Sequence, residues 1–329
     1  MDGGLGGFYI RGTYWNVCML TYIVRQILYA IIIILGVMTV TFVIIRVIPG
    51  DPARLIQGQH ADPQAIESIR AQWKLDRPLL EQYGNFLLNA AKGDLGESYI
   101  DRLAVTERLL SDLGWTIVLS ISALAIASVL GIAIGVVSAW KPNTLFDSGT
   151  MIVALLGISV PVFVVGIVVK IFFIQKWQLF PGIVGTGQNP FDLRYLTLPM
   201  LALAARPLSI IARITRSSML DVLSQDYIRT ARAKGLAIRT TILRHGLRNA
   251  LNPVITTISA WLASTLAGTL FIEQMFNRKG IGQTAFLAIS QRDFPVIQGV
   301  VLLTAIIFVV INLLVDIIYA YLDPKVRLS

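Results

Sequence analysis

The segment YIRTARAKGLAIRTTILRHGLRNAL, residues 227–251, decides how the rest of this chain is interpreted. It lies between two apolar segments and carries six basic residues: Arg229, Arg232, Lys234, Arg239, Arg244 and Arg248. The sequence predicts a short helix, a break at Gly235, and a second helix that runs through Ile242 to Leu251. A short basic helix held between two membrane spans is typical of a docking element, because it can enter a groove on an acidic partner protein.

Composition places the chain among membrane proteins. Of its 329 residues, 55% are hydrophobic and only 14% are charged. The net charge of +9 is explained better by basic cytoplasmic loops than by nucleic-acid binding. The one cysteine, Cys18, excludes an internal disulfide, and His60 and His245 show no metal-ligand spacing.

Six apolar segments are long enough to cross a hydrocarbon core of about 30 Å as helices. The least regular of them, Tyr195–Thr215, contains Arg206, Pro207 and Arg213. It is included as a span because, without it, the loops on either side would be assigned to inconsistent sides of the membrane. The predicted spans are Gln26–Ile45, Leu113–Trp140, Ser148–Val169, Tyr195–Thr215, Ala250–Ile272 and Phe294–Val315. The chain is therefore predicted to be an all-α polytopic membrane protein.

Basic residues in the short loops set the predicted orientation. With the N-terminus inside, eleven basic residues fall on the inner side and five on the outer side, so both termini are expected in the cytoplasm. The glycine-rich residues 1–25 show no cleavable signal and are predicted to form a loose cytoplasmic tail, with Met1 or Met19 as the true start.

The predicted division of the chain follows from these spans. A first transmembrane helix at 26–46 precedes an extracytoplasmic insertion at 47–112, and residues 113–322 hold five helices with the connecting loop at 217–250, before a cytoplasmic tail at 323–329. Within the insertion, Asp62–Asn89 has helical periodicity. Pro63 suits a first helical position and Pro78 is expected to separate two helices. A small helical cap over the outer face is predicted in preference to a linker.

Polar residues inside the spans are candidates for a translocation pathway. Arg206 precedes a proline where a helix commonly bends, and Asn312 and Asp316 lie on one face of the last span. Asp316 has the alternative of a bond to a neighbouring helix, and Arg216 the alternative of reaching the membrane interface. The Gly131 and Gly135 pair indicates close helix packing. No phosphate-binding loop ending in Lys-Ser/Thr is present, so ATP is not expected to bind this chain through a P-loop.

The loop resembles the "EAA" loop of permease subunits of binding-protein-dependent ABC importers. Aligned on Gly235, the EAA positions are Arg229, Thr230 and Ala231, so the acidic residue and the later proline of the general pattern, here Arg248, are both replaced. These departures match the branch that imports dipeptides, oligopeptides, glutathione and nickel, in which YIRTARAKG is followed by HxLRNAxxP. That form is found here at Tyr227–Gly235, then at His245–Ala250 and Pro253.

Other segments resemble the same branch in the same order, and the resemblance covers residues 20–327. They are Ile48–Pro52, Gly93–Gly96, Arg216–Leu223, Gly280–Gly282, Arg292–Gln298 and Asn312–Asp316. The resemblance is to the B-type subunit of dipeptide and oligopeptide permeases. It implies the fold of the type I ABC importer transmembrane domain, with five core spans preceded by one peripheral span.

The resemblance also implies partners and site residues. The expected partners are a homologous second permease, two ATPase subunits that bind ATP and Mg²⁺, an extracytoplasmic binding protein and membrane lipid, in a bacterial inner membrane and without nucleic acid. Transport is expected by alternating access, with no catalytic site and no cofactor in this chain. Binding-protein contacts are assigned to Asp51, Gly280 and Gly282. ATPase coupling is assigned to Arg229, Thr230, Ala231, Arg232, Ala233, Lys234, Gly235 and His245.

Two other classes remain open at this stage. An ion-coupled secondary transporter needs carboxylates or broken helices near mid-membrane, and only Asp316, near one end of a span, is present. A membrane anchor or assembly subunit would need no binding protein. Within the importer class, di- and oligopeptides are the expected substrates, and glutathione, nickel chelates and opine-like compounds are the alternatives.

Overall fold

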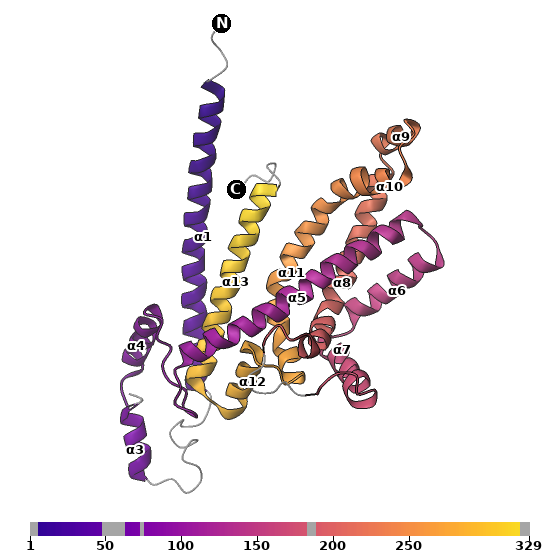
Figure 1. Cartoon of the computed structure of the whole chain (residues 1–329). Helices are drawn as coiled ribbons and strands as arrows, with labels where there is room; N and C mark the ends of the chain where they lie inside the picture. Colours follow the sequence, from indigo (N-terminus) through magenta and orange to yellow (C-terminus); the bar gives the residue numbers. More distant parts are fainter. Residues whose placement is uncertain (1–5, 48–62, 73–75, 183–188, 323–329) are drawn as a thin grey trace. The chain divides into compact units, whose positions relative to one another are not determined.

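The computed structural model describes residues 6–47, 63–72, 76–182 and 189–322 of the chain. In that part the fold is helical, with one isolated antiparallel bridge between Glu97 and Ala104 (Figure 1). The elements are α1 (Gly6–Val47), α3 (Pro63–Gln72), α4 (Leu79–Ala91), α5 (Val105–Trp140), α6 (Leu145–Ser159), α7 (Val162–Val169), the π-helical η1 (Lys170–Lys176), α8 (Leu193–Leu223), α9 (Asp226–Ala233), α10 (Ile238–Thr240), the π-helical η2 (Thr241–Leu247), α11 (Arg248–Met275), α12 (Ile281–Gln291) and α13 (Phe294–Leu322).

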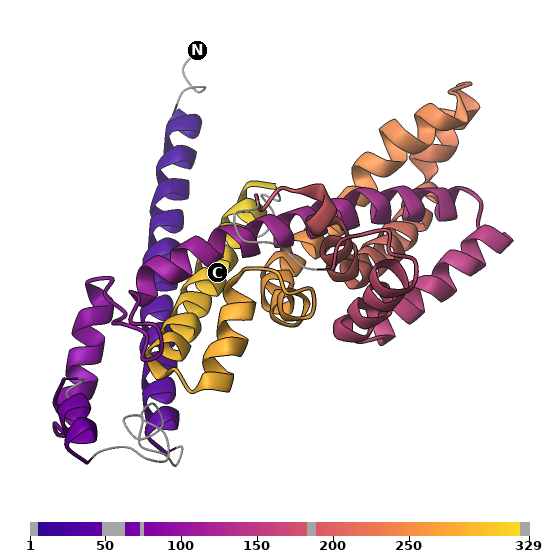
Figure 2. The same cartoon turned by 60° about the horizontal axis from the view of Figure 1, so that its bottom comes forward.

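The chain forms two compact units. One consists of Met1–Thr106 with Gln291–Ser329, and the other of Glu107–Ser290. In the first unit α1 and α13 lie side by side (Figures 1 and 2), and the Gln26 amide donates a hydrogen bond of 3.2 Å to Asp316. The predicted loose tail at 1–25 is wrong for residues 6–25, which continue the first helix. Extending an existing helix by one residue costs far less than starting a new one, which explains the added turns.

The insertion contains the two predicted helices. Pro63 opens α3, and Pro78 lies immediately before α4, as the sequence predicts. α4 packs on α1, where the ring centroids of Phe42 and Tyr83 are 5.3 Å apart. The predicted boundary at Asp112 is too late, because α5 already begins at Val105. Its first turn is fixed by Thr106, whose hydroxyl donates to the Gly93 carbonyl at 2.8 Å.

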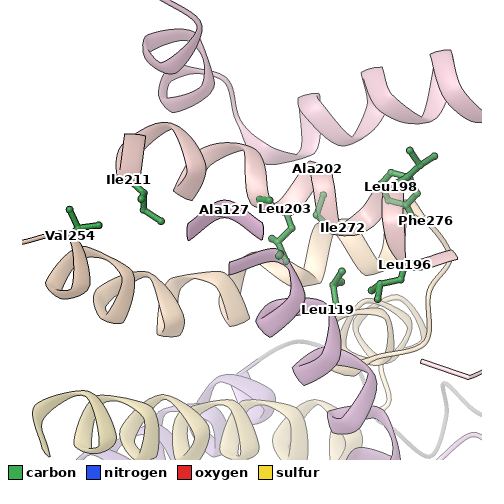
Figure 3. Close-up of a cluster of buried hydrophobic side chains, with 12 residues drawn as sticks. Leu119, Ala127, Leu196, Leu198, Ala202, Leu203, Ile211, Val254, Ile272 and Phe276 are labelled. Carbon is green, nitrogen blue, oxygen red and sulfur yellow. The ribbon is translucent and has the colours of Figure 1, made fainter. Parts of the chain in front are cut away.

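The core of the second unit lies where α5, α8 and α11 meet. Figure 3 shows the buried side chains that these helices contribute, listed here in chain order: Leu119, Ala127, Leu196, Leu198, Ala202, Leu203, Ile211, Val254 and Ile272, with Phe276 just beyond α11. Gly131 and Gly135 permit the close approach of α5 to α8. A Cβ atom on Gly135 would lie 2.5 Å from the Thr215 Cβ. The close helix packing that the sequence predicts at this glycine pair is therefore confirmed.

Two predicted spans are bent. The predicted span Ser148–Val169 is not one straight helix, because Leu145–Ser159 and Val162–Lys176 meet at 108°. Pro161 has no backbone N–H and forces Val160 into an extended conformation, so the helix ends there. The fifth span bends by 51° between Ile238–Leu266 and Gly268–Met275. The described residues thus hold four helices suited to crossing a membrane, or six if each bent pair is one span.

Candidate functional site

The helix α9 (Asp226–Ala233) lies within the connection between α8 and α11. Gln225 is extended and starts it, and Asp226 and Arg232 place charges of favourable sign at its two ends. Gly235 ends it in the left-handed conformation, with φ of +80°. The Gly235 N–H donates to the Arg232 carbonyl and the Leu236 N–H to the Ala231 carbonyl, the two bonds of a Schellman cap. The predicted break at Gly235 is confirmed.

One face of α9 anchors it to the rest of the unit. Ile228 is fully buried, and the Asn249 amide donates a hydrogen bond of 2.8 Å to the Tyr227 hydroxyl. α9 contacts η2, in which His245 is half-buried. The predicted second helix does not end at Leu251, because α10, η2 and α11 follow one another directly from Ile238 to the bend after Leu266. The loop is therefore attached directly to a membrane span.

The opposite face of α9 is exposed and basic. Of the predicted coupling residues, Ala231 is half-buried, while the exposed ones are Arg229, Thr230, Arg232, Ala233, Lys234 and Gly235. Arg229 lies 3.7 Å from Asp226 in an exposed ion pair, a kind that adds little stability. A Cβ atom on Gly235 would have no atom within 4 Å, so glycine is favoured there by the left-handed backbone conformation and not by close packing. This face therefore exposes basic side chains to solvent, with small residues between them.

A small apolar cluster supports the base of the loop. Met219 of α8, Ile242 of η2 and Ala250 of α11 are buried together with Val136 and Ala139 of α5. This cluster joins the loop to α5 as well as to the two helices that it connects. The loop that carries α9 is therefore packed against three helices, α5, α8 and α11.

A buried polar cluster surrounds Glu273, near the end of α11. The Glu273 carboxylate accepts hydrogen bonds of 2.7 Å from the Thr116 hydroxyl and from the Gly282 N–H. Thr116 in turn accepts from the Ile281 N–H at 2.9 Å. Gly280 and Gly282 are buried, and a Cβ atom on Gly280 would overlap the Glu273 carboxylate. The two glycines therefore let the connection between α11 and α12 fold over this acid.

Arg278 belongs to the same connection and is fully buried. Its guanidinium donates to the Pro190 carbonyl at 2.8 Å and lies 5.1 Å from the centroid of the Trp115 ring. Burial lowers the pKa of Arg278, and the negative charge of Glu273 opposes that shift. Together these contacts fix α12 to the first turns of α5.

A second polar contact fixes the turn before α5 in the first unit. Asp293, just before α13, accepts hydrogen bonds from the Ser98 hydroxyl at 2.6 Å and from the Tyr99 N–H at 3.0 Å. Both Ser98 and Asp293 are buried. These hydrogen bonds thus join two segments that are about 195 positions apart in the sequence.

Comparison with known proteins identifies the family. The profile of the binding-protein-dependent transport system inner membrane component matches residues 131–328, and a profile of the N-terminal part of such membrane components matches residues 19–120. The chain belongs to this family. It is a multi-pass permease component of an ABC transporter, which confirms the family resemblance found in the sequence.

Curated relatives align over almost the whole permease. The chain is 40% identical to the dipeptide transport system permease protein DppB of Alkalihalophilus pseudofirmus, over 94% of this chain and 100% of that protein. It is 38% identical to the glutathione transport system permease protein GsiC of Escherichia coli, over 94% of this chain and 99% of that protein. A crystal structure of an amino acid ABC transporter with histidines shares the fold, with a TM-score of 0.51, 14% identity, and coverage of 65% of this chain and 93% of that one. The predicted type I importer fold is confirmed.

The three pathway candidates do not form one cluster within either unit of the permease. Arg206 is exposed on α8, with its guanidinium 5.6 Å from the centroid of the Trp261 ring. Asn312 is half-buried on α13, in the other unit. Asp316 accepts the hydrogen bond from Gln26, which confirms the alternative prediction that it bonds to a neighbouring helix. Their role in translocation remains a prediction.

Of the three predicted binding-protein contacts, Asp51 lies outside the described residues. The structure buries Gly280 and Gly282 in the Glu273 cluster, and their contact with a binding protein also stays a prediction. Sequence analysis missed Glu273 itself, although the signal was present: it is the first charged residue after a long uncharged segment, and G-I-G follows soon afterwards.

Arg216 has a partner that the sequence does not predict, and its position at the membrane interface stays a prediction. Its Nε atom lies 2.5 Å from Asp147 Oδ1 and its Nη2 atom 2.7 Å from Asp147 Oδ2, in a bidentate pair between α8 and α6. The Asp147 side chain is only 3% exposed. A carboxylate shielded from solvent needs an opposite charge, and Arg216 supplies it with two charge-assisted hydrogen bonds.

Proposed function

We propose that this chain is one of two translocating permease subunits of an ATP-driven importer of short peptides. The observation that carries the proposal is the geometry of α9. It is a short basic helix with one face anchored by Ile228 and the other open to solvent, on a loop continuous with a membrane span. Such a helix suits a groove on a cytoplasmic ATPase with acidic residues at its rim.

The proposed coupling follows from the way α9 is attached. ATP and Mg²⁺ are bound by the partner ATPase subunits, whose closure moves the docked α9. The loop transmits this movement to α8 and α11, and the membrane domain exchanges an outward-open for an inward-open state. A ligand shifts such an equilibrium only through its different affinities for the two states, so ATP and the loaded binding protein both favour the outward-open one.

Short peptides are the proposed cargo. The relatives with dipeptide and glutathione in their names are similarly close to this chain, at 40% and 38% identity. Both cargoes are small and peptide-like, which supports di- and oligopeptides, with glutathione next and nickel chelates or opine-like compounds as further alternatives. A binding protein delivers the cargo on the outer side, a homologous permease completes the pathway, and both termini lie in the cytoplasm.

The first test is purification of the chain from its native membrane in mild detergent, with mass spectrometry of the proteins that accompany it. We expect a second permease and P-loop ATPases. The ligand carried by the associated binding protein then identifies the cargo. Recovery of the chain alone or as a homomer, under conditions in which a known ABC importer stays intact, would refute the importer assembly and return an ion-coupled transporter to consideration.

The second test addresses α9 in the assembled importer reconstituted in proteoliposomes. Arg232→Glu and Lys234→Glu reverse exposed charges on α9 without touching its anchoring face, whereas Lys141→Glu makes the same change on the loop between α5 and α6. We expect the α9 variants to weaken ATPase docking and lose ATP-dependent peptide uptake. Equal uptake by Arg232→Glu and Lys141→Glu would contradict a coupling role for α9.

A further inference from the structure

The helix α4 has three faces of different character. Tyr83 and Phe86 pack on Phe42 of α1, with ring centroids 5.3 and 6.1 Å apart. On a second face Leu80 and Leu88 are 82% and 62% exposed. At about 100° per residue, the polar residues fall on a third face, and they are Glu81, Gln82, Asn85 and Asn89. A helix surrounded by water would need only two faces, one towards the protein and one polar.

The contact with α1 sets the depth of α4 in the membrane. The hydrophobic span of α1 covers Val24–Ile45, and the Tyr83 hydroxyl lies 2.6 Å from the Thr39 hydroxyl within that span. At 1.5 Å per residue, Thr39 lies about 9 Å and Phe42 about 5 Å inside its outer end. Amphipathic helices that lie in a membrane interface are buried by about 5–10 Å, so the two depths agree.

We propose that α4 is an interfacial membrane helix, with Leu80 and Leu88 in contact with the acyl chains of the outer leaflet. The polar face then points to water and the aromatic face holds α4 against α1. This differs from the cap predicted by the sequence, which covers the outer face from the aqueous side. The proposal does not depend on the cargo or on the ATPase contact.

The surroundings of α4 specify lipid as the occupant of the leucine face. The adjacent turns of α1 expose Val40, Val43 and Ile44, each by more than half, so α4 packs beside a surface that is itself apolar. Glu81 is the only charged residue within α4, and at about 100° per residue it lies at the border between the leucine face and the polar face. Lys92 follows the last turn, where a long basic side chain can reach the headgroups. A water-soluble binding protein would have to displace lipid to reach these leucines.

The proposal is tested with single nitroxide labels on the complete importer in nanodiscs. The only native cysteine is removed by Cys18→Ser. Labels are then attached through Leu80→Cys and Leu88→Cys, with Asn89→Cys as the exposed control on the polar face and Val43→Cys as the control for lipid on α1. Accessibility to oxygen, which concentrates in lipid, is compared with accessibility to a water-soluble nickel chelate.

We expect labels at 80 and 88 to match the label at 43, with high oxygen and low nickel accessibility, and the label at 89 to show the reverse order. High nickel accessibility at 80 and 88 would overturn the proposal and favour a cap in water. Low accessibility to both reagents would also overturn it, since a protein surface would then cover the leucines. Both positions are exposed on the helix, so each label gives an independent result.

Discussion

Replacement of Arg216 by alanine should be among the most damaging single changes in the second unit. The substitution removes both hydrogen bonds of the bidentate pair and leaves the Asp147 carboxylate without its opposite charge. Two neutral donors remain, the Asn143 N–H at 2.9 Å from Asp147 Oδ2 and the Ser138 hydroxyl. Neutral donors do not replace a charged guanidinium, so most of the cost of burying the carboxylate is left uncompensated.

The expected loss is about 3–5 kcal/mol, the typical cost of removing one partner from a buried ion pair. A second estimate agrees, since two unit charges about 4 Å apart attract each other by about 4 kcal/mol at an effective dielectric constant of 20. Arg216 itself is 24% exposed, so the loss should fall near the lower end of that range. Arg216→Lys should recover part of it, because lysine keeps the charge but not the two-pronged geometry.

The assay is a double-mutant cycle on the free energy of unfolding, measured by SDS titration in mixed micelles. Asp147→Asn removes the buried charge, and the double variant Asp147→Asn with Arg216→Ala removes the pair. Because the second substitution then leaves no unpaired carboxylate, the double variant should be more stable than Arg216→Ala alone. A coupling energy of about 2 kcal/mol or more is expected, and additivity within about 0.5 kcal/mol would refute the reasoning.

Three further predictions concern other contacts, with the unfolding free energy of each variant as the measurement. Gly282→Ala should cost about 1–3 kcal/mol, because its Cβ atom would overlap the backbone of α11. The control Gly149→Ala on α6 places its Cβ atom in open space and should be neutral or stabilising. Equal effects of the two variants would contradict the close packing at Gly282. Ser98→Ala should cost about 1.5–3 kcal/mol through loss of its bond to the Asp293 carboxylate, and an unchanged value would show that the turn does not depend on it. Gly235→Ala should cost about 1 kcal/mol from left-handed strain, with Gly235→Asn milder; the opposite order would argue against the Schellman cap.

Much of the fold could be predicted because it depends on local sequence. The apolar segments predict helices in a membrane, and the ends of α3, α4 and α9 follow from Pro63, Pro78 and Gly235. These signals act within a few residues, where steric and capping preferences are strong. The loop that contains α9 was located in the same way, because its basic residues and Gly235 are contiguous, whereas its coupling role stays a prediction.

Contacts between distant residues could not be predicted from one sequence. Arg216 and Asp147 are 69 positions apart, and Thr116 and Glu273 are 157 apart, so neither pair has a local pattern. Each charged partner alone resembles an ordinary residue near a membrane interface. This is why neither the Arg216–Asp147 pair nor the Glu273 cluster could be predicted.

The bend between α6 and α7 shows a second limit of prediction from sequence, which concerns proline. Pro161 ends a helix, yet Pro199 and Pro207 lie inside α8 and Pro253 lies inside α11. A proline in a membrane helix is tolerated where neighbouring groups satisfy the freed carbonyl, and this depends on the surrounding helices. The prolines therefore mark positions where a helix can bend without telling which bend forms, and the 51° bend between Leu266 and Gly268 has no proline at all.

The close approach of α5 to α8 limits how this permease can move. A Cβ atom on Gly131 would lie 2.9 Å from a methyl carbon of Ile211, and the contact at Gly135 is tighter still. Sliding one helix along the other would force these backbones apart, which favours movement of α5 and α8 together. The break at Pro161 differs, because no continuous helical hydrogen bonding crosses it, so a change of the angle between α6 and α7 breaks no helical hydrogen bond there.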